Sequence, residues 1–246
     1  MKRFFEIMGV VLVSMLAMSS CSDSGRERPN MIIAEEGNIR INGLMTVDAA
    51  NRDKVIELSK QLINASLGDE GVIDLDIMES VTRPNKLMFF LTWKDQATFD
   101  KHRASVHFRT LIPQVQEICQ FEGKDFVVSD VEDIDHEKPF RFNVVMTAKN
   151  RDRYIHIVKE VIDNTLKNDA GVIEYDIFSS LLQPERLLLV EVWENRVSLV
   201  GHLNSPYFTK ARKRTKGLVD DTQYIARMQE DRGISSSDHI KSDNSD

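Results

Sequence analysis

Residues 69–108, DEGVIDLDIMESVTRPNKLMFFLTWKDQATFDKHRASVHF, align without a gap on residues 169–208, DAGVIEYDIFSSLLQPERLLLVEVWENRVSLVGHLNSPYF. Thirteen of the 40 positions are identical: Asp69, Gly71, Val72, Ile73, Asp76, Ile77, Ser80, Pro84, Leu87, Trp93, His102, Ser105 and Phe108. Such an internal repeat indicates one structural unit that has been duplicated. A unit of about 100 residues is too long for a solenoid repeat and suits a small domain. We therefore expect two similar domains, 37–132 and 138–230, called below the first and the second half.

The hydrophobic periodicity of the first half predicts an α+β unit. Its predicted elements are strands at 39–47, 72–80 and 87–93, a helix at 53–66, a short helix capped by Asp95, a second short helix from 108 to about 115, and a strand within 117–131. The order β-α-β-β-α-β is that of a ferredoxin-like domain.

The second half repeats this order. Its predicted elements are strands at 141–147, 172–180, 187–193 and 219–228, and helices at 153–166, 197–203 and 206–215. Strands 87–93 and 187–193 are apolar on both faces, which predicts a sheet covered on both sides. Helices cover one face, so we expect the two halves to pack sheet to sheet as a pseudo-dimeric α/β barrel.

The ends of the chain read as segments outside the fold. Residues 1–21 show the charged, apolar and small-residue order of a secretory signal, and Cys21 stands where a bacterial lipoprotein is lipidated. An ordinary signal peptide with an incidental cysteine is the alternative. We expect a lipid anchor at Cys21, a polar tether over 22–36, a disordered tail over 231–246, and a location at the cell envelope.

Composition excludes several function classes. The net charge of −7 argues against nucleic-acid binding, which needs a basic patch. Neither a dinucleotide-binding glycine motif, a P-loop nor a metalloprotease motif occurs. The six histidines show no metal-ligand spacing, so we expect no metal site. Cys119 falls in a strand-like pattern and is interpreted as a small core residue.

One motif, present twice, resembles a known family. Trp93, His102 and Ser105-Val106-His107-Phe108 recur as Trp193, His202 and Ser205-Pro206-Tyr207-Phe208, and Glu191-Val192 precedes the second tryptophan. This pattern resembles the antibiotic biosynthesis monooxygenase family. The resemblance implies a dimeric α+β barrel with an apolar pocket between each sheet and its helices. It also implies oxidation of phenols, quinols or polycyclic aromatics by molecular oxygen, often without flavin or metal, so we expect no cofactor.

For such a reaction His102 and His202 are the candidate bases, because histidine titrates near neutral pH. The alternative, which we favour, is that each packs beneath a strand–helix junction and bonds to the backbone. The presence of this histidine in both halves does not distinguish the catalytic from the structural interpretation, because duplication copies structural residues as well as catalytic ones.

Five further residues are candidates for substrate binding. Trp93 and Trp193 could stack on an aromatic ligand or serve as core anchors, and Tyr207 matches His107 of the first half. Asn42 and Asn143 lie amid apolar neighbours on first strands, where a buried amide must find partners. Each could hold a substrate oxygen or pair with adjacent backbone.

A haem-degrading branch of the superfamily uses an asparagine, a tryptophan and a histidine. Asn42 and Asn143 match the asparagine, but the tryptophan position falls on His102 and His202. The histidine position falls near Ile112 and Arg212, so haem degradation is not expected.

Two functions remain open. The first is a cofactor-independent monooxygenase that oxidises a small quinol-like or aromatic compound at the cell envelope. The second is a non-catalytic small-molecule-binding or structural lipoprotein with the same barrel. The second half keeps Glu191 where the first has Leu91, so we expect it to be the active one.

Overall fold

The structure is a computed structural model that describes residues 35–128, 135, 137–220, 224–229 and 234–235. The first half contains β1 (Ile39–Thr46), α2 (Arg52–Ser66), β2 (Val72–Ser80), β3 (Lys86–Trp93), α3 (Gln96–Arg103), α4 (Val106–Ile118) and β4 (Gln120–Val127). The second half contains β5 (Phe140–Thr147), α5 (Arg151–Asn168), β6 (Val172–Ser180), β7 (Arg186–Trp193), α6 (Arg196–Leu203), α7 (Pro206–Thr215) and β8 (Tyr224–Gln229). A short strand, β9 (Ile234–Ser235), follows.

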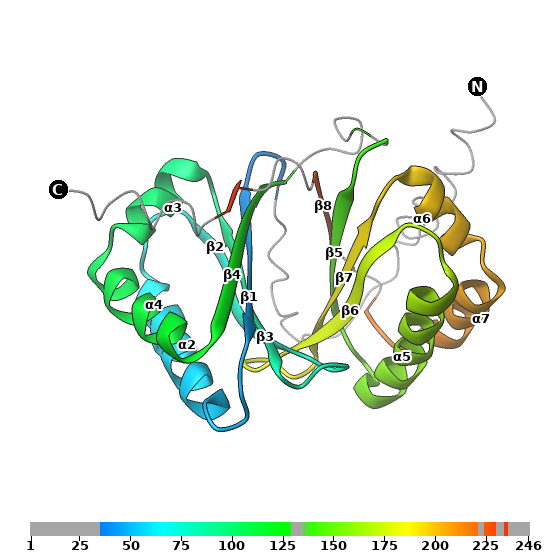
Figure 1. Ribbon diagram of the computed structural model, residues 1–246, viewed down its shortest axis with the longest axis horizontal. Helices are drawn as coiled ribbons and strands as arrows, with labels where there is room; N and C mark the ends of the chain where they lie inside the picture. Colours follow the sequence, from blue (N-terminus) through cyan, green and yellow to red (C-terminus); the bar gives the residue numbers. More distant parts are fainter. Residues whose placement is uncertain (1–34, 129–134, 136, 221–223, 230–233, 236–246) are drawn as a thin grey trace, which may run out of the picture.

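All nine strands form one antiparallel sheet in the order β8-β5-β7-β6-β2-β3-β1-β4-β9. The two halves join where β2 pairs with β6, with Met78 opposite Ser180 and Ser80 opposite Phe178. The sheet bends there, so that the two half-sheets face each other and the helices cover both outer sides (Figure 1). This confirms the duplicated ferredoxin-like fold and the sheet-to-sheet packing. The hydrogen-bonded junction between β2 and β6 was not predicted.

Three apolar cores hold the molecule together. Each half has one core between its sheet and its helices. The third core lies between the two half-sheets and contains Met78, Met88, Phe90, Val145, Phe178, Leu188 and Val190. Full burial of such a side chain contributes about 1.5–3 kcal/mol, so this shared core couples the two halves.

Polar groups complete the junction in a crosswise arrangement. Asp76 accepts hydrogen bonds from Ser180 Oγ and Arg186 Nη1, both at 2.8 Å. Asp176 accepts a matching bond at 2.8 Å from Ser80 Oγ. Burial raises the pKa of Asp76 to about 6, although Arg186 and Ser180 act to lower it. Buried carboxylates therefore gain their partners from the opposite half, which fixes the register of the β2–β6 pairing.

Two local expectations need correction. Cys119 lies at the C-cap of α4, which runs further than predicted, and its Sγ donates to the carbonyl of Val115 at 3.1 Å. Of residues 231–246, which were predicted to be a disordered tail, Ile234–Ser235 pair with β4. The rest of this segment lies outside the described residues. By contrast, the Asp95 cap is confirmed, because its side chain accepts from the backbone N–H of Thr98 at 2.8 Å.

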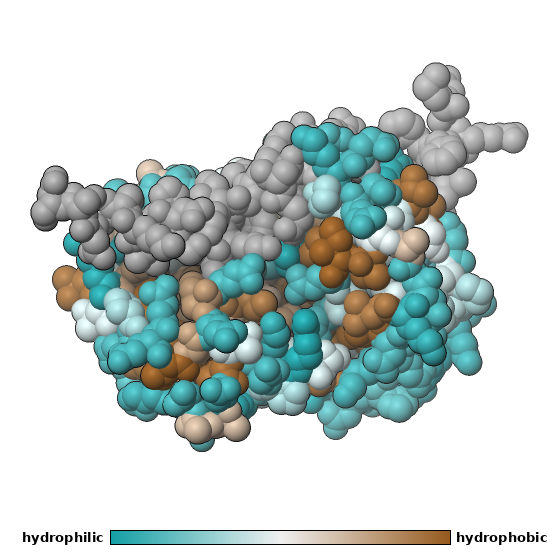
Figure 2. Space-filling view, viewed as in Figure 1, coloured by the Kyte–Doolittle hydropathy of each residue, from teal (hydrophilic) through white to brown (hydrophobic). Residues whose placement is uncertain are grey.

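The signal segment 1–21 with Cys21 and most of the tether 22–36 lie outside the described residues. Within the described part of the chain, no helix is both long and apolar enough to cross a membrane. The visible surface is largely hydrophilic with separate apolar patches (Figure 2). Large exposed apolar residues occur in both halves, for example Val106 and Val197.

Candidate functional site

His202 lies in the last turn of α6, below the end of β7. Asn195 caps the start of α6 and Ser205 caps the start of α7, so the first turns of both helices are fixed by side chains. The imidazole is 1% exposed and packs against Trp193 and Phe208, with ring centroids 4.9 and 4.5 Å away. The predicted base is thus a buried side chain between the sheet and the helices.

Both ring nitrogens of His202 have partners. Nδ1 lies 2.7 Å from Asp169 Oδ2, and Nε2 lies 3.5 Å from the hydroxyl of Tyr175, at the long limit of a hydrogen bond. Burial lowers the pKa of His202, although Asp169 acts in the opposite direction. A neutral imidazole whose Nδ1–H donates to Asp169 satisfies the shorter of these two contacts.

Glu191 lies beside this histidine and is the most perturbed acid of the second half. Its side chain is buried on β7, where Trp193 Nε1 donates to Oε2 at 3.1 Å and Tyr175 supplies a second hydrogen bond. Burial raises the pKa of Glu191 to about 7, and the two hydrogen bonds only partly oppose this. Burial also raises the pKa of Tyr175 and of Tyr154, so both phenols stay protonated.

These groups form one continuous series of hydrogen-bonded side chains: Asp169, His202, Tyr175, Glu191 and Trp193. They come from β6, β7, α6 and the loop before β6. The Asp169 side chain is 11% exposed, so the series runs from a buried carboxyl towards solvent.

The first half places its histidine in the same position but surrounds it with different groups. His102 stacks on Trp93 with centroids 4.5 Å apart, and its Nδ1 lies 2.8 Å from Asp69 Oδ2. His107 Nε2 lies 2.8 Å from the same oxygen. Leu91 stands where the second half has Glu191, and Trp93 Nε1 has no hydrogen-bond partner. The first half therefore has a histidine–aspartate cluster and no buried carboxylic acid beside its tryptophan.

The sequence predicted no metal site, but the structure brings three possible ligand groups together in this cluster. Asp69, His102 and His107 bring one ligand atom each to within 4.8 Å of one another. Spacing along the chain did not reveal it, because the aspartate comes from the loop after α2, more than 30 residues earlier.

Asn42 and Asn143 bind each other. Asn143 Nδ2 donates to Asn42 Oδ1 at 3.1 Å, and Asn42 Nδ2 donates back at 3.4 Å. Both side chains are buried between the two half-sheets, on the face away from the helices. Each asparagine thus has a partner that neither sequence interpretation considered. The two amides lie on the opposite side of the sheet from His102 and His202.

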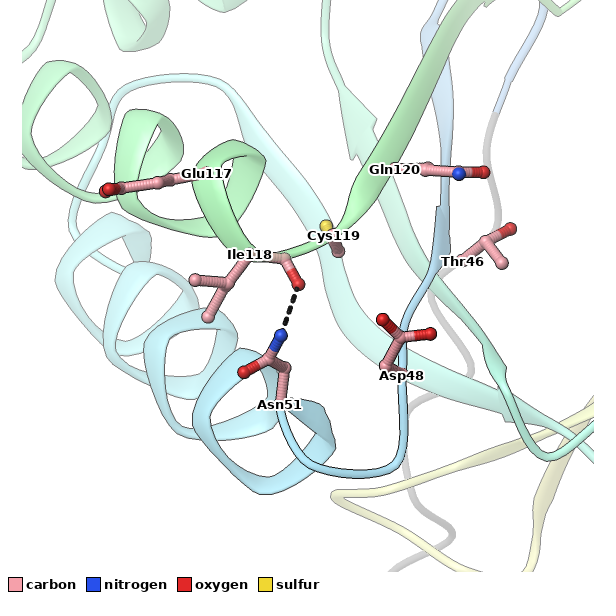
Figure 3. A pocket seen from close by; sticks show the side chains of 7 residues that line it. All are labelled: Thr46, Asp48, Asn51, Glu117, Ile118, Cys119 and Gln120. Carbon is pink, nitrogen blue, oxygen red and sulfur yellow. Dashed lines mark hydrogen bonds between the residues drawn. The ribbon is translucent and has the colours of Figure 1, made fainter.

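A pocket of about 320 Å³ lies at one end of the first half (Figure 3). It is lined by Thr46, Asp48, Asn51, Glu117, Ile118, Cys119 and Gln120. Asn51 Nδ2 donates to the Ile118 carbonyl at 3.3 Å beside it. None of the residues predicted for catalysis or substrate binding lines this pocket.

Sequence reasoning assigned no role to Glu191, Tyr175 or Tyr154. Leu91 and Leu75 align with the first two in the repeat, and Val55 matches Tyr154 as the fourth residue after the N-cap of its helix; all three are apolar. The change from Leu91 to Glu191 was used only to choose the second half. The two further changes from apolar to polar, at Tyr175 and Tyr154, are the signal that would have identified the site. Tyr207, predicted to bind substrate, lies near His202 with ring centroids 6.1 Å apart.

Comparison with known proteins places both halves in one family. The family model described as antibiotic biosynthesis monooxygenase matches residues 38–114 and 143–214, together more than half of the chain. The Bacillus subtilis (strain 168) protein named "Putative monooxygenase YcnE" is 24% identical over 80 residues, which cover 32% of this chain and 84% of that protein.

Solved structures give similar matches. A conserved protein of unknown function from Bacteroides thetaiotaomicron VPI-5482, described as a possible oxidoreductase, is 32% identical. The match covers 38% of this chain and 99% of that one, with a TM-score of 0.37. An anthrone oxidase-like protein is 16% identical over 83% of this chain and 96% of its own, also with a TM-score of 0.37.

Proposed function

The chain belongs to the antibiotic biosynthesis monooxygenase family, and we propose that its second half oxidises a small phenol- or quinol-like molecule with molecular oxygen. The observation that carries this proposal is the buried carboxyl of Glu191, whose pKa is raised to about 7. A base with a pKa near the working pH combines a useful ionised fraction with a real affinity for the proton.

The proposed reaction begins with proton transfer from the substrate hydroxyl to Glu191. The resulting phenolate is electron-rich and passes one electron to oxygen, giving a substrate radical and superoxide. These combine into a peroxide, which loses water to form a quinone. One oxygen atom of O₂ thus enters the product and the other leaves as water. The protein supplies the base, a dry environment and hydrogen bonds to the developing oxyanion.

His202 and Tyr175 act as positioning residues in this scheme. Asp169 fixes the imidazole, whose Nε2 faces the Tyr175 hydroxyl, and Tyr175 in turn bonds to Glu191. A proton taken up by Glu191 can leave along this series to Asp169, the member nearest solvent. Trp193 holds the carboxylate, and Tyr207 lies on the helix side of the same site.

The first half lacks this series, because Leu91 and Leu75 replace the carboxyl and the phenol. His102 and Trp93 are therefore not proposed as a second reaction site. Asn42 and Asn143 satisfy each other between the sheets, so they are assigned to the junction between the halves.

Oxygen uptake with a panel of quinols, naphthols and anthrones tests the proposal. Glu191→Gln lowers kcat/KM at least about 100-fold, since a general base contributes that much or more. Glu185→Gln, in the exposed turn before β7, is the matched control and leaves the rate unchanged. Since Glu191 must be ionised, kcat/KM rises with pH and levels off above about 7.

Absence of uptake with every compound, or an unchanged rate in Glu191→Gln, favours the alternative of a binding or structural protein. Tyr175→Phe sharpens the test. It removes a hydrogen bond that lowers the pKa of Glu191, so the rise in kcat/KM moves to higher pH.

The same proposal places the enzyme at the cell envelope through a lipid on Cys21. It is supported by the charged and apolar order of residues 1–20. Radiolabelled palmitate should enter the chain and should fail to enter Cys21→Ala; equal labelling of both would contradict the anchor.

A further inference from the structure

We propose that the first half contains a binding site for a divalent first-row transition metal ion, formed by Asp69, His102 and His107. The two imidazole nitrogens converge on one carboxylate oxygen, each at 2.8 Å, and the three ligand atoms lie within 4.8 Å of one another. Two imidazoles and a carboxylate are ligands that Zn²⁺ and its neighbours in the first row prefer.

The fold holds the three ligands on separate supports. Asp69 follows α2, His102 is in the last turn of α3, and His107 is in the first turn of α4. Ser105 caps α4 between the two histidines by accepting from the backbone N–H of Phe108 at 3.2 Å. The site therefore does not depend on one flexible segment.

The two nitrogen–oxygen separations of 2.8 Å are about half an ångström shorter than a bound ion requires. Tetrahedral zinc with bonds of about 2.0–2.2 Å needs ligand atoms roughly 3.4 Å apart, so the carboxylate oxygen would move by about half an ångström. Asp69 and His107 have side chains 23% and 22% exposed. This exposure lets solvent provide a fourth ligand, while His102 is anchored below by Trp93.

The surrounding charges do not oppose a cation. The basic side chains flanking His102 are engaged elsewhere: Lys101 pairs with Glu70 at 2.8 Å and Arg103 with Asp100 at 3.6 Å. The carboxylate of Asp69 therefore faces two imidazoles, whose neutral forms can each offer a lone pair to an ion.

The second half provides an internal control. It keeps Asp169 and His202 at 2.7 Å, but Tyr207 occupies the position of His107. A neutral phenol is a poor ligand, so the second half lacks the third donor. The proposal thus predicts one ion for each chain.

The experiment uses the complete chain, purified without a histidine tag, stripped with chelator and titrated with Co²⁺. Binding is followed by the visible d–d absorption, and Zn²⁺ affinity is measured by competition with a chromophoric chelator. The wild type takes up one equivalent. His107→Tyr, which copies the residue of the second half, weakens binding at least about 100-fold.

Two further variants keep the test decisive. Tyr207→His completes the ligand set in the second half and raises the stoichiometry to two. His156→Ala removes the exposed histidine that pairs with Glu160 on α5, and it leaves binding unchanged. No uptake by the wild type, affinity unchanged in His107→Tyr, or loss of binding in His156→Ala would overturn the site. One equivalent in Tyr207→His would show the ligand set to be wrong. None of these readouts depends on oxygenase activity.

Discussion

The two halves keep the same aspartate, tryptophan and histidine on the same backbone, but they surround them with different interiors. The two interiors differ in residue type at three core-facing positions. With the first-half residue given first, these are Val55 and Tyr154, Leu75 and Tyr175, and Leu91 and Glu191. In the second half these changes connect the histidine to a buried acid, whereas in the first half the same space is hydrocarbon. The shared residues therefore specify the fold, and the residues that differ specify the chemistry.

The two tryptophans differ in whether the indole N–H has a hydrogen-bond acceptor, and this difference affects stability. Trp193 donates its indole N–H to Glu191, whereas Trp93 keeps a buried N–H without an acceptor. An unsatisfied buried donor costs about 1–3 kcal/mol, and a buried carboxyl that ionises also carries a cost. Each half thus tolerates one unfavourable group. Exchanging residues between the halves measures which of the two groups has the larger free-energy cost.

The largest effect on stability is expected from Glu191→Leu, which gives the second half the residue of the first. The pKa of Glu191 is about 7 in the folded protein against an ordinary 4.5. The folded state therefore binds the proton more tightly, and the free energy of unfolding falls as pH rises from 4.5 to 7. This loss amounts to about 3 kcal/mol.

Urea unfolding across this pH range, compared between the wild type and Glu191→Leu, isolates the effect. The variant gains about 3 kcal/mol relative to the wild type between pH 4.5 and pH 7. Glu185→Leu, at an exposed site, shows no such gain. Parallel curves for the wild type and Glu191→Leu would show that the acid is not buried in the folded state.

A smaller difference is expected from replacing each tryptophan by phenylalanine. Both changes remove the same atoms from a core, but only Trp193→Phe removes a hydrogen bond and leaves Glu191 with one donor fewer. Trp93→Phe instead removes an unsatisfied donor. Trp193→Phe should therefore lower the free energy of unfolding by about 1–3 kcal/mol more than Trp93→Phe. Equal losses of unfolding free energy in the two variants would contradict the different hydrogen bonding of the two indole N–H groups.

The smallest effect concerns the amide pair that joins the halves. Asn42→Ala and Asn143→Ala each leave the other amide without a partner, whereas the double variant removes both groups. A double-mutant cycle should give a coupling energy of about 1 kcal/mol. Additive losses would mean that the two amides do not stabilise each other.

The sequence predicted the fold well because hydrophobic periodicity and the internal repeat can both be recognised in the sequence itself. The strand at 72–80 and the cap at Asp95 depend on neighbours in the chain, and both are present in the structure. The helix that ends at Ile118 runs past its predicted end near Val115, and Cys119, which the alternation placed in a strand, is its C-cap.

The candidate site was harder to predict because its contacts join distant segments. Tyr175 reads as an ordinary strand aromatic until Glu191 and His202 pack beside it. Asp69 reads as a loop acid until α3 and α4 bring two histidines to it. Likewise, the apolar neighbours of Asn42 on β1 indicate that it is buried without indicating that its partner is Asn143.

The continuous sheet through β2 and β6 has an evolutionary consequence. When two identical chains assemble, every substitution is made on both sides, so an acid that destabilises one interior destabilises the other too. Here the polypeptide itself links the two sides, and Leu91 and Glu191 coexist in every molecule. One side is free to specialise while the other preserves stability, and the partnership does not come apart on dilution.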